Sequence, residues 1–168
     1  MQRFLVTGLV AVFAMASFAY AERAVDDSGR TTDRRLLRGM ENSGLKYRID
    51  DDGDVRLIME LENGRTQLVH VMSKTNTYKN TEVREIWSRV MVTPKARLAL
   101  DDALYFLHRN SEVKFGAFQV VESGDSVIFI FSATVAADAS GEELKDVISM
   151  VAKAADVEEE KFTHKDEN

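Results

Sequence analysis

The sequence contains no cysteine, and this absence removes several kinds of chemistry at once. Without thiols the chain cannot form a disulfide, a thiolate metal site, a cysteine nucleophile or a lipid attachment on an N-terminal cysteine. A domain with this composition has to be held together by its apolar core, without disulfides. Proline occurs once, at Pro94, and glycine nine times, so the sequence is not of low complexity.

Basic residues are also in short supply. The chain has 22 Lys and Arg residues against 28 Asp and Glu residues, which gives a formal net charge of −6. Binding to a polyphosphate backbone depends on clustered Lys and Arg, so nucleic acid is not an expected partner. A length of 168 residues predicts a single folded domain rather than two.

A long apolar run occurs at the start of the chain, where Arg3 precedes the apolar residues 4–18. Ala19 and Ala21 then place small residues three and one positions before Glu22, which is the pattern that signal peptidase cleaves. We therefore expect residues 1–21 to be a signal peptide and the mature chain to begin at Glu22. The mature protein would be periplasmic or secreted, without a stable membrane anchor. The alternative is an uncleaved anchor helix, but a helix that spans the bilayer needs about 20 apolar residues.

The first half of the mature chain predicts one helix and three strands. Residues 22–30 are expected to be a flexible polar lead-in. Thr31 or Thr32 would cap a helix that runs to residue 43 and ends before Gly44. Alternating apolar residues predict strands at 54–61, 65–72 and 81–92, with a polar loop at 73–80. The turn between the first two strands contains Asn-Gly, a strong hairpin signal. The expected buried helix residues are Leu36, Leu37 and Met40.

The second half predicts a helix, two strands and a final helix. The helix at 96–110 has Leu100, Leu104 and Leu107 on one side. Strands are expected at 114–121 and 126–135, and the second of these is apolar on both faces, as for a strand inside a sheet. Ser140 and Glu143 form a capping box that starts a helix to about residue 159, and residues 163–168 form a polar tail. The prediction is an α+β domain, with helices packed on an antiparallel sheet in the order α-β-β-β-α-β-β-α.

This order of elements resembles that of the YbjN family, which shares the fold of the type III secretion chaperones. The resemblance covers residues 31–162 and depends on structural punctuation. It is carried by residues 44–47 (GLKY) before 50–54 (DDDGD), by Leu107 and Asn110 at the helix end, by Gly116 and Phe118, and by Ser140, Glu143 and Leu144. The resemblance implies this fold and the family's label of a proposed sensory transduction regulator. It implies no reaction and no catalytic residues, and the signal peptide sets this chain apart from the cytoplasmic members.

Candidate metal and catalytic residues are few. The acidic run 50–54 fails as a calcium loop, because aligning Gly53 with the invariant glycine puts Arg48 and Met59 at ligand positions. We expect a solvated acidic turn, with weak divalent binding as the alternative. His70, His108 and His164 lack a second ligand at zinc spacing, so no metal or cofactor is predicted. No nucleophile motif occurs, and the carboxylate pairs, including those at 158–160, are expected to be solvated.

One group of residues predicts a contact surface. Trp87 alternates with Glu85 and Arg89 on the polar side of its strand, where an exposed tryptophan would mark a binding site. We expect a non-enzymatic binding or accessory module, regulatory or stress-related in role, that contacts a protein partner or forms a homodimer. Two alternatives remain: a chaperone-like protein that holds unfolded segments along its sheet, and an enzyme of an unrecognised type.

Overall fold

The computed structural model describes residues 23–25, 31–62 and 64–166. The predicted signal peptide, including Ala19, Ala21 and the cleavage position before Glu22, lies outside these residues. The elements follow in the order β1 (Arg23–Val25), β2 (Thr31–Asp33), α1 (Arg34–Ser43), β3 (Arg48–Ile49), β4 (Val55–Glu60), β5 (Thr66–Tyr78), β6 (Thr81–Pro94), a 3₁₀ turn (Lys95–Arg97), α2 (Leu100–Glu112), β7 (Ala117–Ser123), β8 (Ser126–Ala136) and α3 (Gly141–Thr163).

The main sheet has six strands in the order β3-β4-β5-β6-β8-β7, and neighbouring strands are antiparallel. β1 and β2 form a separate two-stranded antiparallel sheet. The predicted α+β class and the α-β-β-β-α-β-β-α order are confirmed, with β1, β2 and β3 added. β1 lies within the stretch expected to be a flexible lead-in.

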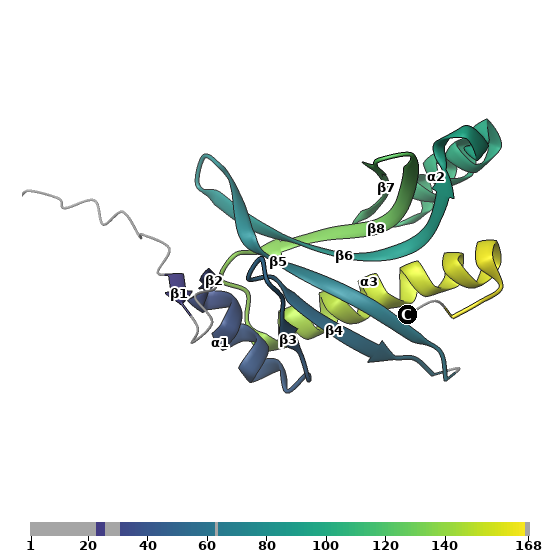
Figure 1. Cartoon of the computed structure of the whole chain (residues 1–168). Coiled ribbons are helices and arrows are strands. Elements are labelled where there is room, and N and C mark those ends of the chain that lie inside the picture. The colour runs from purple at the N-terminus through teal and green to yellow at the C-terminus, as the bar shows by residue number, and fades with distance from the viewer. Residues whose placement is uncertain (1–22, 26–30, 63, 167–168) are drawn as a thin grey trace, which may run out of the picture.

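The core lies between one face of the sheet and α3, which runs beneath it (Figure 1). Most of the predicted apolar stripe of α3 is fully buried: Leu144, Ile148, Val151, Ala152 and Ala155 are at most 1% exposed, whereas Val147 is only partly buried. They pack with sheet residues that include Val69, Ile86 and Phe129. The capping box of α3 is present as predicted, because Ser140 and Glu143 each accept a hydrogen bond from the other's backbone amide.

The first helix starts later than the sequence indicated. Its N-cap is Asp33, whose carboxylate accepts the Arg35 amide, rather than Thr31 or Thr32. Thr32 is buried instead, and its hydroxyl donates to the Gly53 carbonyl at 2.9 Å. Leu36 and Met40 are buried as expected, whereas Leu37 is only partly so. Thr32 does not cap α1 because it lies in β2 and its hydroxyl bonds to the acidic turn, so Asp33 is the capping residue.

The prediction of a polar loop at 73–80 is wrong. β5 continues to Tyr78, and the chain reverses at residues 79–80, where Lys79 has a positive φ of 53°. The extended hairpin pairs Thr75 with Arg84 and Tyr78 with Thr81 after a bulge that follows Val71. Polar residues occupy this segment because the hairpin projects beyond the helix-covered part of the sheet (Figure 1). Burial does not require apolar residues there, and the alternation that predicts a strand is lost.

Two helix bounds also differ from expectation. α2 begins at Leu100 rather than residue 96, because residues 95–97 form a 3₁₀ turn directly after Pro94. α3 continues to Thr163 instead of ending near residue 159. The extension is held by tertiary contacts: the Phe162 ring lies 5.1 Å from that of Phe106 on α2.

A buried ion pair joins the two sheets. Arg84 is 1% exposed and donates to the Asp33 carboxylate at 2.9 Å and to the Ala137 carbonyl at 2.8 Å. It also donates to two carbonyls of β5, those of Met72 and Ser73. Burial raises the pKa of Asp33, but hydrogen bonds from Arg35 and Arg84 outweigh this effect and hold that pKa below its ordinary value. This junction fixes β2 and the start of α1 against the hairpin.

Candidate protein-binding surface

The predicted contact residues lie on the sheet face opposite α3. Trp87 pairs with His70 across β5 and β6, and their rings stack 3.9 Å apart with an interplanar angle of 1°. The indole N–H lies 3.3 Å from the Met72 sulfur. Glu85, on the same side of β6, accepts a hydrogen bond from Ser132. The structure therefore brings Trp87 and Glu85 to one face, but it places Trp87 in a half-buried stack rather than at a protruding position.

The stack changes the chemistry of His70. Burial disfavours the imidazolium and the positive charge of Arg56 adds to this, so the pKa of His70 falls to about 4. His108 lies on the exposed side of α2 and His164 is the C-cap of α3. Among the described residues there is no group of three or more His, Asp or Glu side chains placed to hold a metal ion.

The acidic run 50–54 forms a turn whose backbone amides donate to the carboxylate of its first residue. The Asp50 carboxylate accepts the amides of Asp52 and Asp54, and it also pairs with the Arg56 guanidinium at 2.7 Å. The Asp54 carboxylate accepts the Ser73 amide. These oxygens organise the turn and connect it to β4 and β5, which accounts for the acidic residues in structural terms.

Two of the three acids at 158–160 are buried, contrary to expectation, whereas Glu160 is exposed as predicted. Glu158 is 1% exposed and accepts hydrogen bonds from Tyr105 and Arg109 of α2. Glu159 is fully buried and pairs with Arg65 at 2.9 Å. Both acids hold α3 to neighbouring elements. Their burial depends on long-range partners, which a local pattern of consecutive acidic residues does not reveal.

The helix α2 exposes its leucines. Leu100, Leu104 and Leu107 are 73%, 52% and 66% exposed, and we call these three side chains the leucine face. The sequence pattern that predicted the helix is correct, but its apolar stripe does not enter the core of this chain. α2 packs instead through Phe106, which is 4% exposed and contacts the rings of Phe118 and Phe129.

Other large apolar side chains are exposed just before α2 and on β7. α2 stands at one end of the sheet, beside the β7 edge (Figure 1). Leu98, just before the helix, is 40% exposed, and Val120 and Val121 of β7 are 50% and 44% exposed. Val120 and Val121 are successive residues of β7 and point to opposite faces of the sheet, so the two do not form one patch.

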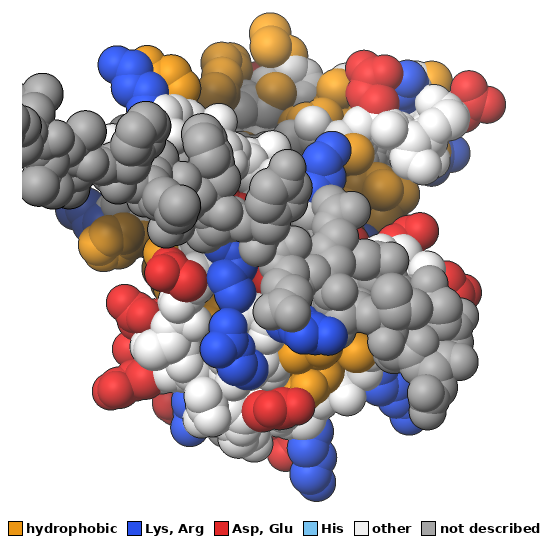
Figure 2. All heavy atoms as spheres, turned by 90° about the vertical axis from the view of Figure 1, so that its left-hand side faces the viewer, with side chains coloured by type: hydrophobic (Ala, Val, Ile, Leu, Met, Phe, Trp, Pro, Cys, Tyr) orange, Lys and Arg blue, Asp and Glu red, His pale blue; other side chains and the backbone are white. Residues whose placement is uncertain are grey.

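Charges are mixed at the opposite end of the molecule, which carries α1. Figure 2 shows Lys and Arg side chains next to Asp and Glu side chains on this face. Arg35, for example, pairs with both Asp33 and Glu82 at 2.8 Å. A face with interspersed charges produces no strong field of one sign.

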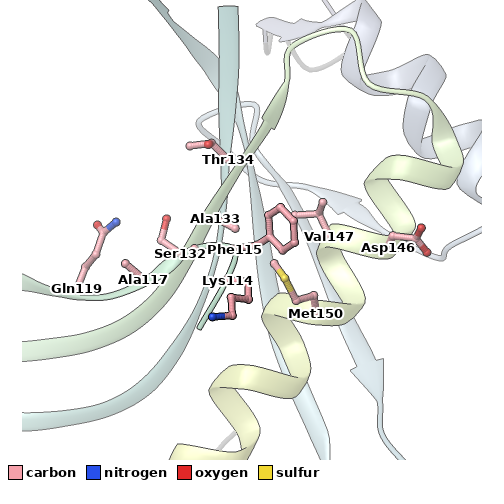
Figure 3. A pocket seen from close by; sticks show the side chains of 11 residues that line it. Lys114, Phe115, Ala117, Gln119, Ser132, Ala133, Thr134, Asp146, Val147 and Met150 are labelled. Carbon is pink, nitrogen blue, oxygen red and sulfur yellow. The ribbon is translucent and has the colours of Figure 1, made fainter. Parts of the chain in front are cut away.

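A groove lies between the β7–β8 edge and α3. Its cavity of about 660 Å³ is lined by Phe115, by Thr134 on β8, and by Val147 and Met150 on α3. The Phe115 ring faces Val147 and Met150 in this groove (Figure 3) and is 75% exposed. The predicted strand at 114–121 included Phe115, but β7 begins only at Ala117, after Gly116 with its positive φ.

Comparisons with known proteins give a similarity in structure but none in sequence. No family model matches the sequence, and no curated protein matches it. In the described part of the chain, no helix is both long enough and apolar enough to cross a membrane. The structure is similar to the crystal structure of E. coli YbjN, described as a candidate transcription regulator, with a TM-score of 0.45 and 15% sequence identity over 73% of this chain and 89% of that one.

Proposed function

We propose that this chain is an exported, non-enzymatic protein-binding module that contacts its partner through the leucine face of α2. The observation that supports the proposal is the exposure of Leu100, Leu104 and Leu107 on one side of a helix. Burying a leucine side chain that was exposed stabilises a complex by about 1.5–3 kcal/mol. Burial of three such side chains offsets part of the translational and rotational entropy that the two molecules lose when they associate.

The arrangement around the leucine face matches the anatomy of a protein interface. Its centre is apolar, while Asp101 and His108 add polar groups along the same helix. Protein interfaces combine an apolar centre with a polar rim in this way. The partner is either a second copy of the chain or a different protein. In both cases the three leucines are buried at the contact.

The non-enzymatic part of the proposal is supported by several ionisable groups that are used in structural contacts. Glu158 and Arg109 hold each other, and Arg84 is bound to Asp33 and backbone carbonyls. His70 is stacked on Trp87 and kept neutral. A catalytic site needs an ionisable group in a cleft that is free to react, and these side chains are committed to structural contacts.

The leucine face is tested by substitution. Light scattering on residues 22–168 would measure the molar mass over a wide range of concentration, and crosslinking in intact cells would capture a different partner. Leu104→Glu should abolish self-association or partner capture, whereas Val157→Glu, at an exposed apolar site on α3, should leave it unchanged. A wild-type chain that stays monomeric and captures no protein would overturn the proposal.

Export has its own test. Cell fractionation followed by N-terminal sequencing should find the mature chain outside the cytoplasm with Glu22 as its first residue. Full-length chain that is retained in the cytoplasm would contradict this part of the proposal.

A chaperone-like role is the second candidate, and the sheet face opposite α3 favours it. On this face Ile58 is 60% exposed and lies next to Leu68 in the β4–β5 register. Such a face offers apolar contact to unfolded segments. An aggregation assay with a model client separates the two functions: suppression at an equimolar ratio that Ile58→Glu removes and Leu104→Glu retains would favour the chaperone-like role.

A further inference from the structure

The edge of β8 is open over its last residues. β7 pairs with β8 from Ser123 opposite Ser126 to Ala117 opposite Ser132, and it begins there. β6 continues alongside β8 as far as Ala136. Within the described ranges, residues 133–136 of β8 therefore have a strand partner on the β6 side only. We call this open edge, with the groove beside it, the β8 notch.

The backbone direction in the notch follows from two contacts. The Ala137 amide donates to the Glu82 carbonyl, which directs residue 137 toward β6. Backbone groups of successive residues alternate between the two edges of an antiparallel strand, so Ser132 and Thr134 face away from β6. The Ser132 carbonyl agrees with this, because it lies only 2.5 Å from the position that a Cβ on Gly116 would take. Thr134 therefore presents its N–H and C=O to the notch, and its residue is exposed.

Gly116 keeps β7 from filling the notch. Its φ of +84° turns the chain away from the strand path, and its close approach to the Ser132 carbonyl leaves no room for a side chain. The preceding residue, Phe115, consequently stands beside the groove instead of pairing with β8 (Figure 3).

The groove walls suit an apolar side chain with charged neighbours. Phe115, Val147 and Met150 form the apolar part, with Lys114 on the β7 side and Asp146 at the α3 rim (Figure 3). Lys114 and Asp146 take part in no ion pair among residues 23–25, 31–62 and 64–166. Charge complementarity therefore favours a segment that carries an acidic and a basic residue on the two sides of an apolar one.

We infer that the β8 notch binds an extended segment of a partner protein by strand addition. The segment pairs with the backbone of Thr134 and places an apolar side chain against Phe115 and Met150. The exposed edge selects an extended chain over a helix, because only an extended backbone offers donors and acceptors that match the edge of a sheet. The Ala136 carbonyl accepts the Ala139 amide, so Thr134 is the residue that offers both backbone groups and a short segment is sufficient. This inference rests on the proposed protein-binding function but uses a surface separate from the leucine face.

The probe is a fluorescein-labelled synthetic peptide that alternates valine and threonine between a terminal lysine and a terminal glutamate. Fluorescence anisotropy with the mature chain measures its affinity, and two N-methylated versions test the pairing. N-methyl groups on the residues whose amides face β8 should weaken binding by about tenfold or more. N-methyl groups on the alternate residues should leave the affinity within about twofold, because those amides point to solvent.

Variants of the protein and amide exchange complete the test. Met150→Glu should weaken peptide binding by about tenfold, whereas Leu104→Glu should not, so failure here is distinguishable from failure of the leucine face. Hydrogen exchange should show the Thr134 amide protected when the unmethylated peptide is added. Equal effects of the two N-methylated peptides, an unprotected Thr134 amide, or sole binding of a second copy of the chain would each overturn strand addition by a partner segment.

Discussion

Asp33→Asn is the substitution whose effect on stability follows most directly from the structure. Asp33 is 4% exposed and its partner Arg84 is 1% exposed. Their carboxylate–guanidinium contact is 2.9 Å, and Asp33 also accepts the Arg35 guanidinium at 2.8 Å. Asparagine keeps an oxygen that can cap α1, but it removes the negative charge and leaves Arg84 buried without an anion.

Breaking a buried ion pair by removing one partner costs about 3–5 kcal/mol. The retained cap and the remaining carbonyl acceptors of Arg84 put Asp33→Asn at the lower end, about 3 kcal/mol. For a domain of this size each kcal/mol lowers the melting temperature by about 2–4 °C, so a fall of about 9 °C is expected.

Urea unfolding followed by circular dichroism measures the change in the free energy of unfolding. Asp51→Asn, at an exposed position of the acidic turn, is the matched control and should change it by less than about 0.5 kcal/mol. The double variant Asp33→Asn with Arg84→Met should be less destabilised than the sum of the single variants, because it no longer leaves an unpaired charge. An Asp33→Asn chain as stable as the wild type would refute the reasoning.

The same junction predicts a loss of stability in acid. The pKa of Asp33 is lowered from 3.8, and hydrogen bonds from Arg35 and Thr75 lower the pKa of Glu82 to about 2. A depressed carboxylate pKa contributes stability above the unfolded value, and this contribution is lost as the pH falls through the folded value. The free energy of unfolding should therefore decline below about pH 4.5, and this decline should be shallower in Asp33→Asn.

Three further predictions concern His70, Gly116 and Ser140. Because burial lowers the pKa of His70 from 6.5 to about 4, the unfolded chain binds the proton first, so stability should fall as the pH drops from 6.5 to 4, and His70→Gln should remove that dependence. The fluorescence of Trp87, the sole tryptophan, reports the titration; an unchanged pH profile in His70→Gln would contradict the stacked geometry. Gly116→Ala should cost about 2 kcal/mol or more in urea unfolding, through positive φ and the clash with the Ser132 carbonyl, while Gly124→Ala, at a positive φ with open space around it, should cost less. Ser140→Ala should lower the free energy of unfolding in urea by about 1 kcal/mol, because the capping box is lost. A loss as large as that of Asp33→Asn would contradict a role limited to bonding the first amides of α3.

Sequence patterns predicted the elements whose determinants are local. The alternation in β4 and the stripe of α3 each report the face that is buried, and the capping box of Ser140 and Glu143 marks where α3 begins. The distal part of β5 was missed because its pairing with β6 is satisfied by backbone hydrogen bonds and polar side chains, which leave no apolar alternation to detect.

The candidate surfaces were less predictable because they depend on what the fold leaves uncovered. The spacing of Leu100, Leu104 and Leu107 is the same whether the stripe enters the core or faces solvent, and only the packing of Phe106 decides between the two. The open edge at Thr134 depends on the difference in length between β7 and β8. The contact role expected of Trp87 stays a prediction.

The position of α3 in chain order has a consequence for biogenesis. This helix seals one face of the sheet, yet it follows every strand that it covers, β8 included. The ribosome therefore completes all six strands of the main sheet before it makes α3. Until residues 141–163 emerge, the apolar face that α3 covers stays exposed. We therefore expect the core between the sheet and α3 to form only after α3 has been made.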